Sequence, residues 1–384
     1  SQSEVGRIHK YIALAYAAKI KLYQAYQQDE TTHAVTSINK ELLREVVSLC
    51  DQVTASNRYG LLDDFQGLDL VANENGKESV FAIQYSMNDG TESAGRINWS
   101  NLLNSPGGGS PYGGDGFFLP SQDLINAYQT DANGLPDFNY QSKSDYSWAV
   151  LNNGVYTLQN TTPNVDPRLD FVVGRPTITW KTCPDKPCEG WVRDKETYGY
   201  NCAKRFWVSP ESSDMFNGWP WGASQLNWQI IRYADILLWK AEALIELNEG
   251  DGLETARDLI NQIRNRARNS AYVKDFNDHS KYAANYLVNP YPADVWNQDY
   301  ARQALRWETR LEKALEGERF FDLVRWGIVE TTMNKYITAE SDNRIYYANA
   351  HFTGGKDEYY PVPNNQYGFS GGKYVQNPGY APFN

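Results

Sequence analysis

IIRYADILLWKAEALIEL, residues Ile230 to Leu247, has the spacing of a helix that buries one side. Its apolar residues recur every three or four positions and so share one face: Ile230, Ala234, Leu237, Leu238, Ala241, Leu244 and Ile245. Asn248, Gly250 and Gly252 then end the helix. A second apolar stripe follows directly, formed by Leu253, Ala256, Leu259, Ile260, Ile263 and Ala267. The two stripes predict a helical hairpin whose apolar faces pack together.

The same helical period occurs in two other parts of the chain. Residues 8–26 and 38–53 carry apolar stripes that predict a first antiparallel hairpin, and residues 300–337 predict another. With the hairpin at 230–268 they make three helical pairs of tetratricopeptide-like size. We therefore expect a mainly α-helical fold in which each pair buries a face against a neighbour.

Between these pairs, the segment from residue 59 to 227 is rich in Gly, Asn, Asp, Ser, Pro and aromatic residues. Two short alternating runs, Ser79–Tyr85 and Arg168–Gly174, predict strands. Phe118–Gln129 predicts the clearest helix, with Ser121 as its N-cap. An irregular segment of this length inside a compact domain usually carries function.

No linker rich in proline or serine divides the 384 residues. We expect a single domain, residues 1–384, made of an N-terminal hairpin (1–58), a loop-rich ligand-binding region (59–227), two C-terminal hairpins (228–337) and a loop-like tail (338–384). The 36 basic and 47 acidic residues give a net charge of −11. This charge repels nucleic acid and anionic lipid, which leaves a neutral or cationic ligand as the expected partner.

Five segments resemble the SusD/RagB family of outer-membrane glycan-binding proteins, and they occur in the family's order. The two most extensive matches are ALRWETRLEKALEGERFFDLVRWG at 304–327 and EYYPVPNNQ at 358–366. The other three are GRIHKYIALAYAAKIKLYQAY at 6–26, FLPSQDLINAYQT at 118–130 and DPRLDFVVGRP at 166–176. Together the segments span most of the chain.

The resemblance implies a SusD-like fold, in which tetratricopeptide-like hairpins support a large irregular region with a few short strands. It also implies a non-catalytic protein, exposed on the outer membrane, that captures oligosaccharides or polysaccharides for uptake through a SusC-like TonB-dependent transporter. Family members are typically lipoproteins with a longer N-terminal region. The first twenty residues of this chain instead have the pattern of an amphipathic helix with Glu4, Arg7 and Lys10. We therefore expect the signal peptide and the lipid anchor, with its membrane contact, to be absent from this chain. Two alternatives are capture of peptides or protein fragments with the same transporter, and a plain tetratricopeptide-type interaction scaffold.

Tryptophans concentrate in the loop-rich segment, where no helix is predicted to bury them: seven of the twelve lie between residues 148 and 228. Sugar rings stack their C–H faces on indole and phenol rings, so this concentration favours a glycan site. The alternative is that the rings fill small cores beneath the loops. The resemblance places the glycan surface upstream of the helix at 230, and the ligand-binding candidates, in order, are Trp180, Trp191, Trp207, Trp148, Tyr146, Trp219 and Trp221.

Glu308, Glu312 and Glu316 share one face of a predicted helix, and paired carboxylates are what glycoside hydrolysis requires. Like charges at this spacing repel one another, so they need cations nearby. The arginines at positions 264, 266 and 268 of the preceding hairpin can supply them. We therefore interpret the acidic face as structural and expect no enzyme activity, because hydrolases place their acids in a cleft.

The four cysteines, Cys50, Cys183, Cys188 and Cys202, leave two interpretations open. Cys183 and Cys188 flank the segment PDKP, a loop that a disulfide would close in an oxidising compartment. A zinc site is the alternative, although the spacing fits no common zinc pattern. The segment 131–137 departs from the calcium-loop pattern and predicts a turn, so we expect no cofactor.

Overall fold

The computed structural model describes residues 4–92, 95–99, 109–113, 116–147, 149–152, 155–158, 163–181, 183–188, 190–218 and 222–383. Helices are the main element of this part of the chain. They are α1 (Lys10–Ala25), α2 (Lys40–Thr54), α3 (Gln122–Ala127), α4 (Arg168–Val172), α5 (Lys195–Tyr198), α6 (Tyr233–Leu247), α7 (Gly252–Asn269), α8 (Gln298–Glu312), α9 (Arg319–Arg325), α10 (Val329–Ser341) and α11 (Asn364–Phe369).

The strands are short and form two-stranded antiparallel pairs. The pairs are β1 (Tyr26–Gln28) with β2 (Val35–Ile38), β3 (Ser79–Ile83) with β12 (Trp228–Arg232), β4 (Gln129–Thr130) with β7 (Asn164–Val165), β5 (Ala149–Asn152) with β6 (Val155–Leu158), β8 (Val173–Gly174) with β11 (Cys202–Ala203), and β9 (Thr179–Trp180) with β10 (Cys183–Pro187).

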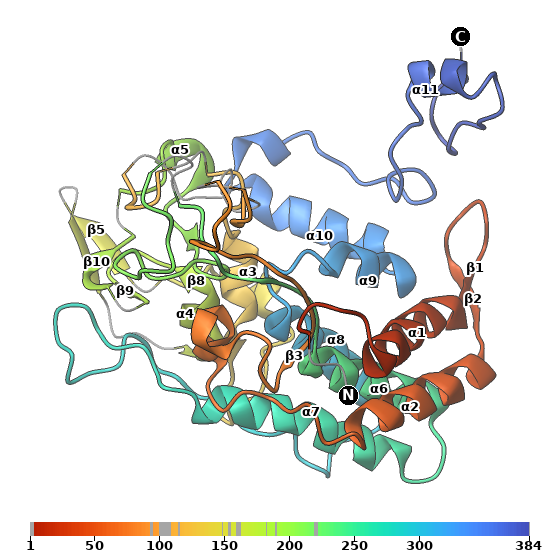
Figure 1. The fold of residues 1–384 in the computed structure, drawn as a ribbon, viewed down its shortest axis with the longest axis horizontal. Helices are drawn as coiled ribbons and strands as arrows, with labels where there is room; N and C mark the ends of the chain where they lie inside the picture. Colours follow the sequence, from red (N-terminus) through yellow and green to blue (C-terminus); the bar gives the residue numbers. More distant parts are fainter. Residues whose placement is uncertain are drawn as a thin grey trace.

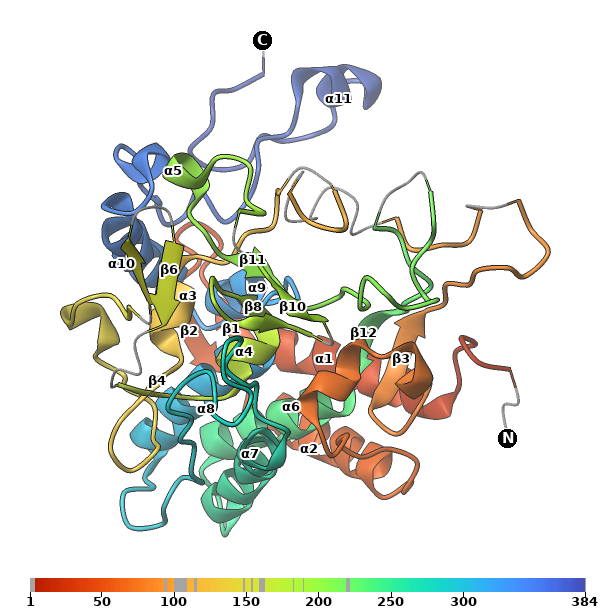
Figure 2. The same cartoon turned by 90° about the vertical axis from the view of Figure 1, so that its left-hand side faces the viewer.

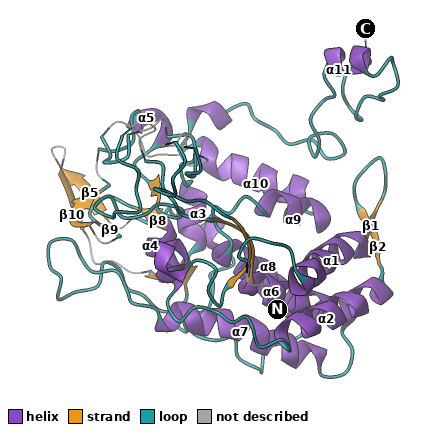
Figure 3. Ribbon diagram, viewed as in Figure 1, coloured by secondary structure: helices purple, strands orange, loops and turns teal. Residues whose placement is uncertain are grey.

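The long helices gather on one side of the molecule, and the loop-rich segment with most of its short strands covers the other side (Figures 1 and 3). The tail after α10 leaves this body and carries α11 outward (Figures 1 and 2). This arrangement confirms the prediction of a mainly helical fold that supports a large irregular region.

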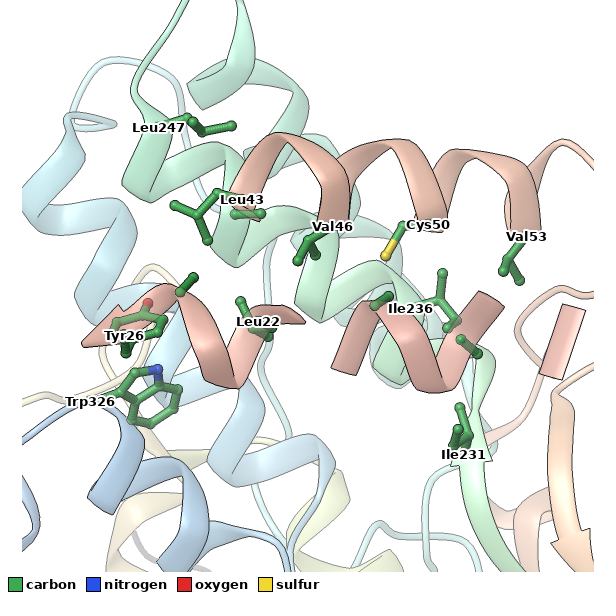
Figure 4. Packing of buried hydrophobic residues seen from close by; sticks show 14 of the residues in the cluster. Leu22, Tyr26, Leu43, Val46, Cys50, Val53, Ile231, Ile236, Leu247 and Trp326 are labelled. Atoms are coloured by element: carbon green, nitrogen blue, oxygen red, sulfur yellow. The ribbon is translucent and has the colours of Figure 1, made fainter. Parts of the chain in front are cut away.

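α1 and α2 form the first hairpin where the apolar stripes predict it. Leu22, Val46 and Cys50 are buried between these helices and α6, and Figure 4 shows their side chains turned toward one another. Asn39 caps α2, because its side chain accepts hydrogen bonds from the backbone N–H groups of Glu41 and Leu42 at 3.0 and 3.2 Å. The hairpin and α6 therefore share one core.

α6 begins at Tyr233, three residues later than its apolar pattern predicts. Ile230 and Ile231 instead belong to β12, which pairs with β3. Their β-branched side chains suit a strand, and the strand that receives them lies about 150 residues earlier in the chain, outside any local pattern. The other end of α6 confirms the prediction, because Asn248 ends the helix in a left-handed conformation.

The predicted stripes of α6 and α7 meet in one buried cluster. Leu237 and Ile245 of α6 pack with Ile260 and Ile263 of α7, and Leu305 of α8 completes the cluster. The second hairpin is therefore confirmed, with α8 as the neighbour that covers its open face.

The third predicted pair, at 300–337, is divided into three helices. α8 and α10 are its long members, and the short α9 lies between them. Gly327 forms the turn between α9 and α10 with a φ of 65°, a conformation that glycine adopts without steric cost. A regular two-helix repeat is therefore not maintained here.

The loop-rich segment agrees with the sequence prediction at two of three elements. Ser79–Ile83 is a strand, and Ser121 caps α3 by accepting a hydrogen bond from the backbone N–H of Leu124 at 3.1 Å. The strand predicted over Arg168–Gly174 is wrong for its first five residues, which form α4, and is confirmed only for Val173–Gly174, which form β8. All five are buried, including Arg168 and Asp170, which form ion pairs with Asp166 and Arg175. The alternation of charged and apolar residues therefore does not mark an exposed and a buried face of a strand.

Candidate functional site

The acidic face of α8 lies in the interior of the protein. Glu308 pairs with Arg264 at 3.0 Å, and Glu312 pairs with Arg232 at 3.0 Å and with Arg266. Two of the three cations predicted for this face, Arg264 and Arg266, are therefore confirmed. The third prediction is wrong, because the side chain at position 268 is exposed on the outer face of α7.

The loop-rich segment also supplies a cation to this network. Glu316, one turn beyond α8, pairs with Arg205 at 3.0 Å and with Arg232 at 2.7 Å. Burial alone raises the pKa of Glu312, but Arg266, Arg232 and other arginines outweigh it and lower the pKa to about 2. A general acid of a glycosidase needs the opposite shift. The acidic face is therefore structural, as the sequence predicts from the spacing of the three glutamates and the arginines of the preceding hairpin.

The best tryptophan candidates are core residues of the loop-rich segment. Trp180, Trp191 and Trp207 are 0%, 6% and 2% exposed and lie with Tyr112 in one buried cluster, which we call the tryptophan cluster. The rings of Trp180 and Trp191 are 5.0 Å apart, and those of Tyr112 and Trp207 are 4.8 Å apart. The indole N–H of Trp180 donates a hydrogen bond to the Tyr112 hydroxyl at 3.1 Å.

This packing corresponds to the alternative in which rings fill a small core beneath the loops. A ring that is covered by another ring cannot stack on a sugar unless the loops open. Tyr146 is buried in the same way, with the Arg175 guanidinium 5.6 Å from its ring centre. The side chains of Trp148, Trp219 and Trp221 lie outside the described residues. Ligand contact by any of these seven candidates stays a prediction.

A cavity of 630 Å³ lies beside Trp207. Its lining includes the ring of Phe65 and the cationic side chains of Lys181 and Arg205. The carboxylate of Asp69 accepts from both cations, at 3.0 and 3.1 Å. The cavity has room for a small sugar, but these charged groups already have partners within the protein.

An exposed group of aromatic rings is formed by α5 and by the turn η5 (Ile345–Tyr347), which follows α10. Figures 1 and 2 show α5 near the end of α10. Tyr198 and Tyr346 are 46% and 52% exposed, and their ring centres are 6.2 Å apart. The ring of Tyr347 lies 4.6 Å from that of Tyr346. We call these three residues the tyrosine surface.

α10 holds the tyrosine surface in place. The hydroxyls of Tyr347 and Tyr336, a residue of α10, are 3.1 Å apart and form a hydrogen bond. Gly199 has a φ of 77°, and a Cβ atom at this position would collide with the guanidinium of Arg344. Glycine adopts this left-handed backbone conformation without steric cost, and its lack of a side chain lets the α5 loop lie against Arg344.

Polar side chains border the same surface. The amide of Asn343 donates a hydrogen bond to the Asp145 carboxylate at 3.2 Å, and Asp145 is exposed. The guanidinium of Arg344 donates to the carbonyl of Asn343 at 2.7 Å. Exposed rings beside amide, carboxylate and guanidinium groups are the combination that sugar recognition requires.

Sequence reasoning missed the tyrosine surface, because its two exposed rings lie about 150 residues apart in the chain. The only local signal is the tyrosine doublet at 346–347 in the tail. No spacing rule connects that doublet with a single tyrosine at position 198.

Cys188 is a free thiol in the structure, and so is Cys202. The structure does not show the predicted Cys183–Cys188 bridge, and the side chain of Cys183 lies outside its description, so this pairing stays a prediction. In the described ranges, no group of three His, Cys, Asp or Glu side chains is arranged to hold a metal ion. None of the described helices has the length and apolar character needed to cross a membrane.

Comparisons with known proteins agree with this architecture. A SusD superfamily protein from Bacteroides vulgatus superposes with a TM-score of 0.64 at 20% identity, covering 99% of this chain and 64% of the other. A SusD homolog from Bacteroides thetaiotaomicron has a TM-score of 0.65 at 18% identity, covering 99% and 65%. A laminarin-binding SusD-like protein has a TM-score of 0.57 at 20% identity, covering 99% and 64%.

The chain thus spans 64% to 65% of the length of the first two solved relatives. None of the curated proteins compared with it matches significantly by sequence. The sequence model of the SusD family matches residues 77–380, which include most of the loop-rich segment, both C-terminal hairpins and most of the tail. The chain belongs to the SusD family.

Proposed function

We propose that this protein is a non-catalytic glycan-binding protein of the outer-membrane surface, which captures oligosaccharides or polysaccharides for a SusC-like TonB-dependent transporter. The tyrosine surface is the observation that carries the proposal. Tyr198 and Tyr346 are each about half exposed and lie against one another, and the neighbouring Tyr347 is hydrogen-bonded to Tyr336 of α10. Rings that are already in place lose less conformational entropy when a sugar binds than rings that must first be ordered.

The chemistry of this surface suits a neutral carbohydrate. The C–H face of a pyranose packs on a phenol ring, and Asp145, Asn343 and Arg344 offer acceptors and donors for its hydroxyl groups. The net charge of −11 disfavours polyanionic ligands. The laminarin-binding structure and a surface glycan-binding protein A from Bacteroides fluxus share the fold, which supports the proposed ligand class.

The proposal is tested by affinity electrophoresis of the protein in gels that contain plant, host or microbial polysaccharides. We expect one polysaccharide class to retard the unmodified protein. Tyr198→Ala and Tyr346→Ala should each weaken this binding about 2- to 12-fold, because one ring contact contributes about 0.5–1.5 kcal/mol. Trp180→Phe keeps an aromatic ring inside the buried cluster and tests whether the indole of Trp180 contacts the glycan directly.

Tyr282→Ala is the matched control, because Tyr282 is also about half exposed but lies on the loop between α7 and α8. Retardation that survives both changes on the tyrosine surface would reject this site. If Trp180→Phe alone abolished binding in a folded protein, the glycan would instead contact the tryptophan cluster. No retardation by any polysaccharide would reject the glycan ligand and favour the second candidate below.

A groove of 730 Å³ between α3, α8 and α10 favours peptide capture or protein interaction as the second candidate function. Apolar side chains including Leu124, Phe320 and Met333 line it together with Arg310 and Arg319. Burial, followed by repulsion from Arg310, lowers the pKa of Arg319 to about 9, so an acidic peptide would relieve an unfavourable charge. Screening the protein against a peptide library and a glycan array in parallel distinguishes the two functions.

A further inference from the structure

Two cysteines lie side by side within the tryptophan cluster. Cys188 directly follows β10, and Cys202 lies in β11. Both are buried, and both belong to the cluster that contains Trp180, Trp191 and Trp207. Residues 189–201 separate them in sequence, so neither strand pairing nor chain continuity forces their side chains together.

The two thiols are neighbours. The thiol of Cys188 donates a hydrogen bond to the carbonyl of Tyr200, two residues before Cys202, at 3.7 Å, and both cysteines are buried in the same cluster. Burial and the neighbouring thiol raise the pKa of Cys202. Cys50 lies in a different cluster, between α1 and α2, and has no such neighbour among the described cysteines. Two neighbouring thiols within a rigid core are one oxidation step from a disulfide.

We propose that Cys188 and Cys202 form a structural disulfide when a disulfide-bonded oxidant of an exporting compartment is available. The thiolate of one cysteine attacks the donor disulfide and releases one donor thiol. The thiolate of the second cysteine then attacks the mixed disulfide and releases the other donor thiol. Each cysteine thus loses one proton and one electron, and the donor disulfide is reduced to two thiols.

The bond would close a loop that carries one ring of the core and one of the exposed rings. Trp191 packs against Trp180 from within this loop, and Tyr198 projects from it onto the tyrosine surface. The disulfide therefore fixes the position of Tyr198 relative to the body of the protein. This consequence rests on the proposed function, whereas the pairing itself does not.

Burial decides when the bond forms. A small oxidant or reductant cannot reach either sulfur in the folded protein, because Cys188 is 1% exposed and Cys202 is 0% exposed. We expect the disulfide to form during folding, before the tryptophan cluster closes. Once the protein is folded, dithiothreitol should reduce the bond only in the presence of denaturant.

The pairing is tested by peptide mapping of the full chain, refolded in a mixture of reduced and oxidised glutathione and alkylated while denatured. Proteolysis before aspartate cuts at Asp185 and Asp194, which separates Cys188 from Cys183 on one side and from Cys202 on the other. Without reduction, we expect a cross-linked pair of fragments, 185–193 and 194–213, and alkylated Cys50 and Cys183. Reduction should split this pair.

A cross-link from Cys183 to either of the other two cysteines would overturn the proposal, and so would four alkylated cysteines. Thiols that become reactive only after zinc is chelated would instead indicate a metal site. These outcomes are read without a ligand, so they do not depend on glycan binding.

Variants give a second readout. Cys202→Ser should lower the Tm of the oxidised protein by about 4 °C, because it removes a cross-link that closes a loop of about 15 residues and so restricts the unfolded chain. Cys183→Ser is the matched control and should leave both the cross-link and the Tm unchanged. If Cys202→Ser does not fold, the peptide map of the unmodified chain still decides. A Cys202→Ser protein that folds with the Tm of the oxidised parent would contradict a structural role.

Discussion

At Glu312, a single carboxylate connects three arginines from distant parts of the chain. Arg168 of α4, Arg232 of β12 and Arg266 of α7 all pair with it. Removing one partner from a buried ion pair leaves the others uncompensated, and this costs about 3–5 kcal/mol. The same removal at a surface pair costs less than about 1 kcal/mol.

Glu312→Gln should therefore lower the free energy of unfolding by several kcal/mol, as measured by urea denaturation. Glu41→Gln is the control, because Glu41 forms an exposed pair with Arg44 and should change stability by less than about 1 kcal/mol. The pKa of Glu312 is lowered from 4.5 to about 2, so its ionised form contributes stability that is complete above pH 4.5 and is lost as the pH falls toward 2. The variant should show a weaker pH dependence across this window.

Two results would contradict this account of Glu312. One is equal stability of Glu312→Gln and Glu41→Gln. The other is loss of glycan binding by Glu312→Gln while its fold and stability are unchanged, because the acidic face would then be functional rather than structural.

At the scale of elements, α1 shows how a helix is held by one of its faces. Leu22 is 0% exposed and packs between α2 and α6, whereas Ile20 on the same helix is 54% exposed. The intrinsic helix propensity of the α1 sequence contributes little to stability by comparison with this packing. The position of a side chain on the helix therefore decides how much it contributes to stability.

Leu22→Ala should lower the free energy of unfolding by about 2–5 kcal/mol, because it removes buried methyl groups and leaves a cavity. Ile20→Ala should change it by less than about 1 kcal/mol, since its side chain is largely in water already. Chemical denaturation of both variants measures the difference. Equal losses would show that the hairpin does not pack as described.

The elements with a clear period were predictable from the sequence, and those defined by distant partners were not. The stripes of α6 and α7 and the cap at Ser121 could be read locally, because a helix places its residues by a fixed period. Ile230 and Ile231 continue that period but pair with β3 instead. Arg168–Val172 alternates charged and apolar residues as a strand does, but it forms α4. Its charged residues are buried with ion-pair partners, which no local pattern reveals.

At the scale of the whole molecule, buried ion pairs connect the loop-rich segment to the helices. Arg205, from the loops, pairs with Glu316 beyond α8, and Arg168 pairs with Glu312 within α8. Charges buried in this way are unfavourable unless both partners stay in place. The hairpins and the loop-rich region differ in sequence pattern but are not separate folding units. We expect them to unfold together.

Differential scanning calorimetry should show one unfolding transition for the chain. Arg205→Ala should move the near-ultraviolet signal of the tryptophan cluster and the far-ultraviolet helical signal to lower temperature together. Lys77→Ala, which removes only an exposed pair with Asp63, should leave both signals nearly unchanged. Two separate transitions, or a shift of only one signal, would show that the regions are independent domains.

The sequence by itself determined the family, the first two helical hairpins and the structural role of the acids on α8, because each depends on local spacing or on an ordered set of motifs. Only the tertiary structure decided which aromatic rings are buried and which are exposed. It brings Tyr198 beside Tyr346 and Cys188 beside Cys202, and it encloses Trp180 within a core. The physical reason is that loops have no period, so the surroundings of a side chain in a loop depend on contacts with distant segments.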